Sequence, residues 1–304
     1  MNSVVDLSPT QAAARPRAVG AQGTVSASHA SRLSPATVTA FVDGVSGHND
    51  RARQATLALA RELGRRLDSP TAVVGEGSAS EARSLGWRSA LQQSRPELDA
   101  LSERAARSLQ TSRFSSFCVT RNAAAIATLP AVARAFPNAA VVWMGAHPCL
   151  HTPGTTRTGD LSGMALAGAS GLWASGHGGD LALANVVLLG ARDLDRAEKH
   201  VIANSPIRNI AAGPRMQEEL AATIAGREVF VHFSADVLRP GIVPTDFQVA
   251  DGLTIDTVVE TARTLARERV VGLQISELEH DPTDRFSTSA QLIVEMLMPL
   301  LPRA

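Results

Sequence analysis

The sequence predicts an α/β fold of three layers, α/β/α, in which helices cover both faces of an eight-stranded, mainly parallel sheet. Two observations lead to this prediction. Short apolar runs alternate with longer stretches of helical character, which is typical of a doubly wound sheet. The apolar runs are also continuous, as expected of parallel strands buried on both faces. Functional residues are therefore expected in the loops at the carboxyl ends of the strands.

The elements follow one another along most of the chain. The predicted strands are 39–42, 72–74, 117–119, 141–144, 186–189, 207–210, 229–233 and 270–275. The segments between them that supply helices are 50–67, 96–109, 123–135, 214–225, 255–268 and 288–298. Residues 1–35 are rich in Ala, Ser, Pro and Arg without apolar periodicity, so we expect a disordered tail. Residues 36–304 then form a single domain, which a chain of this length allows.

Composition narrows the class of protein. The 29 Lys and Arg residues balance the 29 Asp and Glu residues and are scattered, so neither nucleic acid nor a membrane surface is the expected partner. A small molecule is expected instead. Two cysteines, Cys118 and Cys149, are too few for a disulfide framework or a structural zinc site, which favours a reducing compartment. No apolar run approaches the roughly 20 residues of a membrane helix, and no signal peptide is visible, so we expect a cytoplasmic protein.

Four segments, in order, carry a resemblance to a known family. Residues 145–153, Gly-Ala-His-Pro-Cys-Leu-His-Thr-Pro, are similar to Asp-Ala-His-x-Asp-x-Asn-Thr-Pro. Residues 187–195 resemble a segment with Gly-x-Arg-Asp-x-Asp, residues 231–254 one with Asp-x-Asp-x-x-Asp-Pro and Gly-Leu-Thr, and residues 273–279 one with Leu-Asp-Ile-Val-Glu. These are the signatures of the ureohydrolase (arginase/agmatinase) family. The resemblance implies the arginase-like fold and a homo-oligomer.

The same resemblance implies that most metal ligands have been lost. The family binds two manganese ions, about 3.5 Å apart, through two His and four Asp. Asn122 stands at the first of these six ligand positions. Asn at that position also occurs in a subgroup resembling hydroxyarginine hydrolases, which still bind metal. Asp236 supplies one carboxylate and Cys149 one thiol, and together they offer too little negative charge to offset the 4+ charge of two manganese ions. We therefore expect no dimanganese cofactor, with a single softer ion on His147, Cys149 and Asp236 as the alternative. The corresponding positions here are Asn122, Gly145, His147, Cys149, Ser234 and Asp236, of which only His147 and Asp236 keep the family residue.

The substrate-facing positions that the resemblance implies are mixed. Glu277 stands where the family binds the guanidinium, and Asp195 where it contacts the α-amino group. Each has a structural alternative: Asp195 as a helix N-cap, and Glu277 as a partner, with Glu279, of a structural Arg. Ser and Thr in such a loop usually bond only to the backbone. The remaining positions are His151 and Thr158, which replace an Asn and a Ser that bind the α-carboxylate, and Asp160 and Ser162, which replace an Asn and a proton-shuttling His.

The leading hypothesis is a metal-independent enzyme that acts on a guanidino, amidino or amino-acid-like molecule by C–N bond hydrolysis or group transfer. Cys149 would be the nucleophile and His147 its base, with Asp236 and Glu277 as the carboxylates that orient a cation. The alternative for Cys149 is a small buried filler. Two rival functions remain open: a non-catalytic pseudoenzyme that binds a ligand or partner and whose cavity is filled by side chains, and a manganese hydrolase with atypical ligands.

Overall fold

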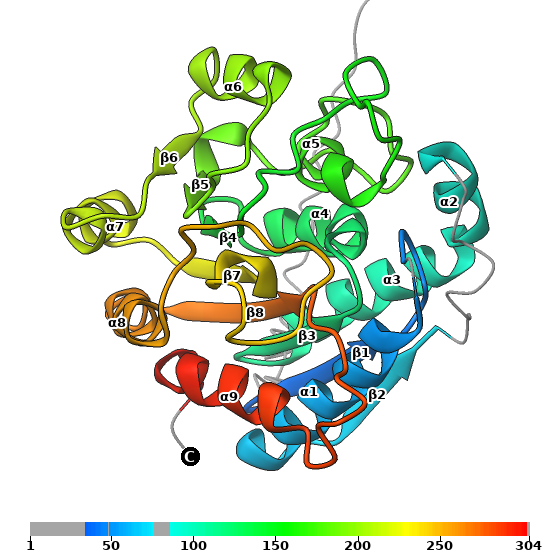
Figure 1. The fold of residues 1–304 in the computed structure, drawn as a ribbon, viewed down its shortest axis with the longest axis vertical. Helices are drawn as coiled ribbons and strands as arrows, with labels where there is room; N and C mark the ends of the chain where they lie inside the picture. Colours follow the sequence, from blue (N-terminus) through cyan, green and yellow to red (C-terminus); the bar gives the residue numbers. More distant parts are fainter. Residues whose placement is uncertain (1–33, 48, 76–85, 303–304) are drawn as a thin grey trace, which may run out of the picture. The chain divides into compact units, whose positions relative to one another are not determined.

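One parallel sheet of eight strands, in the order β2-β1-β3-β8-β7-β4-β5-β6, forms the centre of the molecule (Figure 1). The computed structural model describes residues 34–47, 49–75 and 86–302. These residues belong to a compact unit that spans Leu33–Ala304. The predicted tail, 1–35, lies almost entirely outside the described residues. The sheet and its surrounding helices confirm the predicted fold class.

Every predicted strand is present, within two residues at either end. The strands are apolar because the sheet is covered on both sides, and six of the eight are buried along almost their whole length. The two edge strands, β2 and β6, are the exceptions. The bounds are β1 (Thr37–Phe41), β2 (Thr71–Val74), β3 (Ser115–Val119), β4 (Ala140–Met144), β5 (Val186–Leu189), β6 (Arg208–Ile210), β7 (Val229–Ser234) and β8 (Val270–Ser276).

Helices pack on both faces of this sheet. The six predicted helices are present, and the chain also forms three shorter ones: α2 and α5, which the pattern did not predict, and α6, which begins where Asp195 was considered as a helix N-cap. None of the helices in the described part of the chain is long and apolar enough to span a membrane. The bounds are α1 (Arg51–Leu67), α2 (Trp87–Gln93), α3 (Arg95–Thr111), α4 (Ala125–Ala135), α5 (Ala165–Ala169), α6 (Arg196–Ala203), α7 (Met216–Ile224), α8 (Ile255–Leu265) and α9 (Thr288–Leu297).

Two hydrophobic clusters, one on each face, show why the strands are continuous apolar runs. Along β4, Val142 and Met144 belong to one cluster, while Val141 and Trp143 belong to the other. This is the alternation of side chains that a strand imposes. Burial of this kind contributes about 25 cal/mol per Å² of apolar surface.

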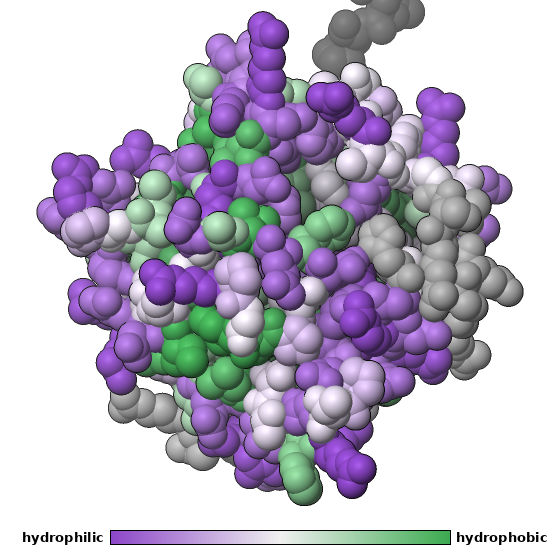
Figure 2. All heavy atoms as spheres, in the orientation of Figure 1, coloured by the Kyte–Doolittle hydropathy of each residue, from purple (hydrophilic) through white to green (hydrophobic). Residues whose placement is uncertain are grey.

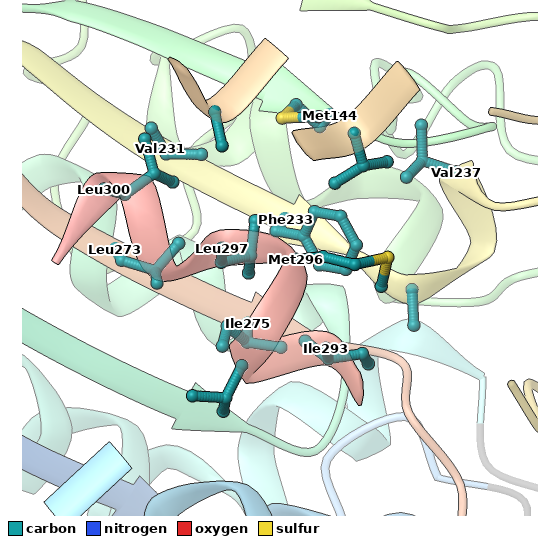
Figure 3. Packing of buried hydrophobic residues seen from close by; sticks show 14 of the residues in the cluster. Met144, Val231, Phe233, Val237, Leu273, Ile275, Ile293, Met296, Leu297 and Leu300 are labelled. Carbon is teal, nitrogen blue, oxygen red and sulfur yellow. The ribbon is translucent and has the colours of Figure 1, made fainter. Parts of the chain in front are cut away.

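Helix α9 covers part of the first cluster. Figure 3 shows how it lays Ile293, Met296 and Leu297 over strands β7 and β8. Figure 2 shows the outer surface in the orientation of Figure 1, where hydrophilic residues cover most of the outline and apolar residues gather nearer the middle.

The strand order explains which loops meet. β8, the last strand in the sequence, lies between β3 and β7, and β7 pairs with β4. All eight strands are parallel, so the carboxyl ends of β3, β8, β7 and β4 meet at one edge. The segments that begin at Thr120, Gly145, Ala235 and Glu277 follow these ends directly. The resemblance placed its candidate residues in these same segments.

The partly buried guanidinium of Arg192 bonds to several backbone carbonyls near this edge. Arg192, in the segment after β5, donates hydrogen bonds to the backbone carbonyls of Asp236, Val237 and Leu238, at 3.0, 3.2 and 3.4 Å. It also donates to carbonyls of the 249–250 segment and to Gly190. Burial lowers the pKa of Arg192, which nearby carboxylates only partly oppose. Arg192 thus holds the turn after β7 in place.

Candidate active site

A cavity of about 600 Å³ opens at the carboxyl ends of the strands. Five of its lining residues carry a carboxyl group, and none of the described lining residues is Lys or Arg. A site of this charge attracts cations. The carboxyl groups belong to Asp160, Asp193, Glu198, Asp236 and Glu277, and the other side chains that line it include Asn122, His147, Cys149, His151, Thr158, Ser162 and Phe247.

The end of the cavity that is lined by the buried carboxyl groups of Asp236 and Glu277, here called the deep end, holds a histidine–aspartate pair. His147 follows β4 and Asp236 lies in the turn after β7, so the pairing of these strands brings the two side chains together. Nδ1 of His147 lies 2.7 Å from Oδ2 of Asp236, and the backbone N–H of Ala146 donates to Oδ1 at 3.1 Å. Nε2 of His147 faces Asp193 at 3.3 Å. Both residues were predicted to be catalytic, and the structure places them in contact.

The charges of this pair stabilise each other. Burial alone lowers the pKa of His147, but the hydrogen bond and charge of Asp236, with Asp193 and Glu277, outweigh it and raise the pKa. Burial alone raises the pKa of Asp236, but the hydrogen bond and charge of His147, with bonds from Ser234 and Ala146, lower it. The two directions agree on one species, an imidazolium held by a carboxylate.

Glu277 lies beside the pair, directly after β8. Its backbone adopts a left-handed φ of 63°, which is uncommon outside glycine. Oε1 accepts a hydrogen bond of 2.6 Å from the backbone N–H of Asn122. Burial raises the pKa of Glu277 to about 7, although Arg121 and that N–H oppose the shift. A carboxyl group with this pKa exchanges a proton near neutral pH.

Arg121 is a site residue that sequence reasoning missed. Its guanidinium, 2% exposed, lies 3.1 Å from Glu277 and 2.8 Å from Glu279. Arg51 also pairs with Glu279, at 2.6 Å. The structural alternative for Glu277 and Glu279, a shared Arg, is therefore what the structure contains. The signal in the sequence was an arginine placed between a buried strand and an apolar helix, where an unpaired charge is costly.

Cys149 lines the cavity, but its surroundings oppose a nucleophilic role. The thiol lies 3.9 Å from the amide nitrogen of Asn122 and 3.7 Å from the backbone carbonyl of His147. Burial, and then the charges of Glu198 and Asp236, raise its pKa well above the usual value. A nucleophilic cysteine needs the opposite shift. The prediction that His147 activates this thiol therefore finds no support in the geometry, because the imidazole bonds to Asp236 instead.

Three of the positions that hold metal ligands in the family, Asn122, Gly145 and Ser234, lie in or beside a buried hydrogen-bond network. Thr128 bonds to Gln274 at 2.5 Å, Gln274 to Nδ1 of His232 at 3.1 Å, and Nε2 of His232 to the amide oxygen of Asn122 at 2.9 Å. The amide nitrogen of Asn122 continues to Ser234 at 3.3 Å. Gly145 leaves room for Trp143, whose ring nitrogen would lie 3.1 Å from an added Cβ. Asn122, Gly145 and Ser234 are thus part of the packing.

His232 is the centre of that network. Its ring stacks on Trp143 with centroids 3.7 Å apart and an angle of 11°. Complete burial lowers its pKa to about 3, and the charge of Asp236 opposes the shift. The ring is therefore neutral, and it can donate from one nitrogen and accept at the other.

The mouth of the cavity gathers the predicted substrate-binding loop. The carboxylate of Asp160 accepts hydrogen bonds from the hydroxyl of Ser46 and, at 2.9 Å, from the backbone N–H of Ser162. Thr158 accepts from the backbone N–H of Asp160 at 3.2 Å. Thr158 thus makes the kind of backbone hydrogen bond that is usual for Ser and Thr in such a loop. The hydroxyl oxygen of Ser162 differs, because it is buried and has no hydrogen-bond partner among the described residues.

Asp195 faces His151 across this mouth. Asp195 caps helix α6 in a capping box with Glu198, so its structural alternative is also present. Its second oxygen lies 3.5 Å from Nε2 of His151, and Oε2 of Glu198 lies 3.8 Å from the same nitrogen. Burial raises the pKa of Glu198. Glu198 was missed, although Asp-x-x-Glu at the start of a helix is a recognisable spacing.

Comparisons with known proteins agree on one family. The sequence pattern of the arginase family matches residues 93–301. The N(omega)-hydroxy-L-arginine amidinohydrolase of Streptomyces lavendulae is 35% identical over 215 residues, 70% of this chain and 78% of that one. Arginase from Bacillus caldovelox superposes with a TM-score of 0.76 at 23% identity, over 90% of this chain and 99% of that one. Proclavaminate amidino hydrolase from Streptomyces clavuligerus superposes with a TM-score of 0.70 at 16% identity, over 89% and 92%.

These comparisons correct the expectation of no metal cofactor. Arginase-family homologues of this kind use a dimanganese cluster, so the prediction from the sequence is wrong. It counted donors at six positions only, and it overlooked the group formed by His151, Asp195 and Glu198. The six positions still do not fit two manganese ions in the family's manner, because they offer one carboxylate, one imidazole and one thiol, and the carboxylate and the imidazole bond to each other.

Proposed function

This chain belongs to the arginase family, and on that premise we propose that it hydrolyses a carbon–nitrogen bond of a small, positively charged guanidino or amidino compound. The observation that carries the proposal is the acidic cavity, in which Glu277 and the His147–Asp236 pair lie together at the deep end. The relative from Streptomyces lavendulae is named for a hydroxylated arginine. Amino-acid-like guanidines are therefore the first substrates to test.

Glu277 is proposed to orient the planar head group. Its carboxylate cannot rotate freely, because the N–H of Asn122 holds one oxygen and Arg121 the other. A carboxylate fixed in this way costs little reorganisation when a cation binds to its remaining lone pairs. The predicted substrate contacts of His151, Thr158, Asp160, Ser162 and Asp195 stay predictions.

His147 is proposed to supply the proton for the departing nitrogen. Water adds to the amidine carbon, a C–O bond forms, the C–N bond breaks, and the departing amine takes the proton that the imidazolium gives. The proton that the water loses returns the imidazole to its charged form. The raised pKa of His147 favours this role, because it increases the protonated fraction of the ring at any given pH. Asp236 keeps Nδ1 bonded and leaves Nε2 directed away from it.

An open cavity favours this proposal over a purely structural role. A pseudoenzyme that had lost its ligand would have a cavity filled by side chains, whereas about 600 Å³ stays open here. The buried Ser162 hydroxyl, without a described partner, also favours a ligand that completes it.

The test is turnover by the purified protein, with and without added manganese. Release of urea or ammonia is measured with L-arginine and Nω-hydroxy-L-arginine. We expect Glu277→Gln and His147→Asn each to reduce kcat at least ~100-fold, the range of a general acid or a fixed charge. Asp281→Asn, on an exposed turn outside the cavity, is the matched control. Turnover that survives in both cavity variants would show that the proposed roles are wrong.

A further inference from the structure

Three side chains at the mouth of the cavity converge on one point. His151, Asp195 and Glu198 each offer one ligand atom, and the three atoms lie within 4.8 Å of one another. Asp195 and Glu198 are three residues apart at the start of α6, which puts them on one side of the helix. We propose that this group binds one divalent transition-metal ion.

The spacing of the atoms suits an ion. Bonds of about 2.0–2.2 Å at tetrahedral angles place two ligand atoms roughly 3.4 Å apart. Nε2 of His151 lies 3.5 Å from Oδ2 of Asp195 and 3.8 Å from Oε2 of Glu198. A direct hydrogen bond would be shorter, about 2.9 Å. The gaps are therefore closer to the separation of two ligands on one ion than to a hydrogen bond.

Each of the three side chains is also held by its other polar atom. Nδ1 of His151 lies 3.3 Å from the hydroxyl of Thr155. Oδ1 of Asp195 accepts from the N–H of Glu198 at 3.0 Å, and Oε1 of Glu198 accepts from the N–H of Leu150 at 3.2 Å. Metal-binding side chains are oriented by outer bonds of this kind. The arrangement leaves Nε2 and Oδ2 facing each other, and Oε2, which also accepts from the backbone N–H of Asp195 at 3.3 Å, lies beside them.

Two further observations point to a ligand at this place. Glu198 is 5% exposed yet lines the cavity with His151, so a buried carboxylate faces the open space. Ser162 is 7% exposed and lines the same cavity, and the carbonyl of the next residue, Gly163, accepts from the N–H of His151 at 3.0 Å. Its hydroxyl has no partner among the described residues. A buried polar group of this kind calls for a ligand or an ordered water.

The start of a helix opposes a cation, but only weakly. The dipole of α6 presents its positive end to this site, and a charge there changes affinity by less than about tenfold. Two carboxylates and an imidazole outweigh that effect. The imidazole favours zinc over calcium and magnesium, which prefer oxygen alone, while the two carboxylates also suit manganese.

Three protein ligands leave coordination positions free toward the cavity. The amino and carboxylate groups of an amino-acid-like molecule could occupy these positions, with its head group at the deep end. This last step rests on the proposed function, whereas binding of the ion does not.

The experiment measures metal binding by the full chain. Protein dialysed against chelator is titrated with zinc chloride and, separately, manganese chloride in a calorimeter, and the bound metal is counted by elemental analysis. We expect one ion per chain, and binding at least ~100-fold weaker in His151→Asn and in Glu198→Gln, since loss of outer-shell partners alone costs about 10–100-fold. Asp195→Asn, which can still cap α6, should weaken binding similarly.

The controls separate this site from the positions used by relatives. His147→Asn removes an imidazole at the deep end, and Asp193→Asn removes a carboxylate that lines the cavity; both should bind the ion as the unmodified protein does. Circular dichroism confirms folding of each variant. Binding lost in His147→Asn but kept in His151→Asn would overturn the proposal, as would no binding of either metal. Failure of the hydrolysis assay alone would leave the metal titration unaffected.

Discussion

The guanidinium of Arg121 lies 3.1 Å from the carboxylate of Glu277, and both side chains are almost fully buried. The residue that the family resemblance assigns to a substrate guanidinium thus already holds one from its own chain. A bound head group would share this carboxylate with Arg121. The pair therefore has a structural task that can be measured apart from catalysis.

Arg121→Met should destabilise the protein by about 3–5 kcal/mol, because it leaves the buried carboxylate of Glu277 without its cation, while Glu279 keeps Arg51. The double variant with Glu277→Gln should recover part of that loss. Urea unfolding followed by circular dichroism measures both. Equal unfolding free energies for Arg121→Met and the unmodified protein would contradict the buried pair.

His147 and Asp236 should make the unfolding free energy depend on pH, His147 as the pH rises and Asp236 as the pH falls. A raised pKa in the folded state means that His147 contributes fully below its unfolded value, near 6.5, and less as pH rises through its folded value. A lowered pKa means that Asp236 contributes above about 3.9 and less as pH falls further. The unfolding free energy, measured with chelator from pH 6 to 9, should therefore fall more steeply in the unmodified protein than in His147→Asn. Parallel curves would show that the pair is not charged.

His232 should weaken the fold in mild acid. Its folded pKa of about 3 lies below its unfolded value, so the unfolded state binds the proton first, and stability falls as pH drops below about 6.5. Between pH 7.5 and 5 this residue alone should cost about 2 kcal/mol. His232→Gln removes this titrating group. The fall in unfolding free energy between pH 7.5 and pH 5 should therefore be about 2 kcal/mol smaller in this variant than in the unmodified protein. An equal fall in both proteins would show that His232 does not have this lowered pKa in the folded state.

Both cysteines should be inert in the folded protein. Burial raises the pKa of Cys118 and Cys149, so little thiolate exists near neutral pH. Mass spectrometry after iodoacetamide at pH 7.5 should find neither alkylated, and both alkylated once urea unfolds the chain. Cys149→Ser should keep turnover within about threefold. Rapid alkylation of Cys149, together with loss of turnover in Cys149→Ser, would restore the nucleophile hypothesis.

Arg192→Lys should loosen the turn that carries Asp236. Lysine has three donors and cannot reach the set of carbonyls that the guanidinium spans. We expect a loss of at least about 2 kcal/mol in unfolding free energy. Arg239→Lys is the matched control, since Arg239 makes one described side-chain bond, to the carbonyl of Gly252. Equal losses in the two variants would remove the special role of Arg192.

The sequence predicts much of the fold, because strand and helix patterns are local. All eight strands and six helices can be located from apolar runs and their periodicity. The short helix α6 can be located only at its start, because its signal is the cap residue Asp195 rather than a long apolar face. The position of β8 between β3 and β7 cannot be derived from local pattern, since its pairing with β3 joins residues more than a hundred positions apart.

The site is only partly predictable, for a related reason. His147, Asp236 and Glu277 can be found from motifs, because each follows a recognisable strand. Their partners cannot. Arg121 owes its role to Glu279, far away in the chain, and the burial that raises the pKa of Cys149 arises only when the sheet is complete. Residue types suggest chemistry, but three-dimensional surroundings decide protonation.

The central place of β8 has a consequence for the growing polypeptide. The ribosome makes this strand last, yet it joins one half of the sheet, β2-β1-β3, to the other half, β7-β4-β5-β6. Until residues 270–276 emerge, both halves expose an unpaired apolar edge, which invites wrong pairing. Nascent chains arrested before Val270 should therefore require chaperones, and the cavity can form only after residues 270–277 have been synthesised.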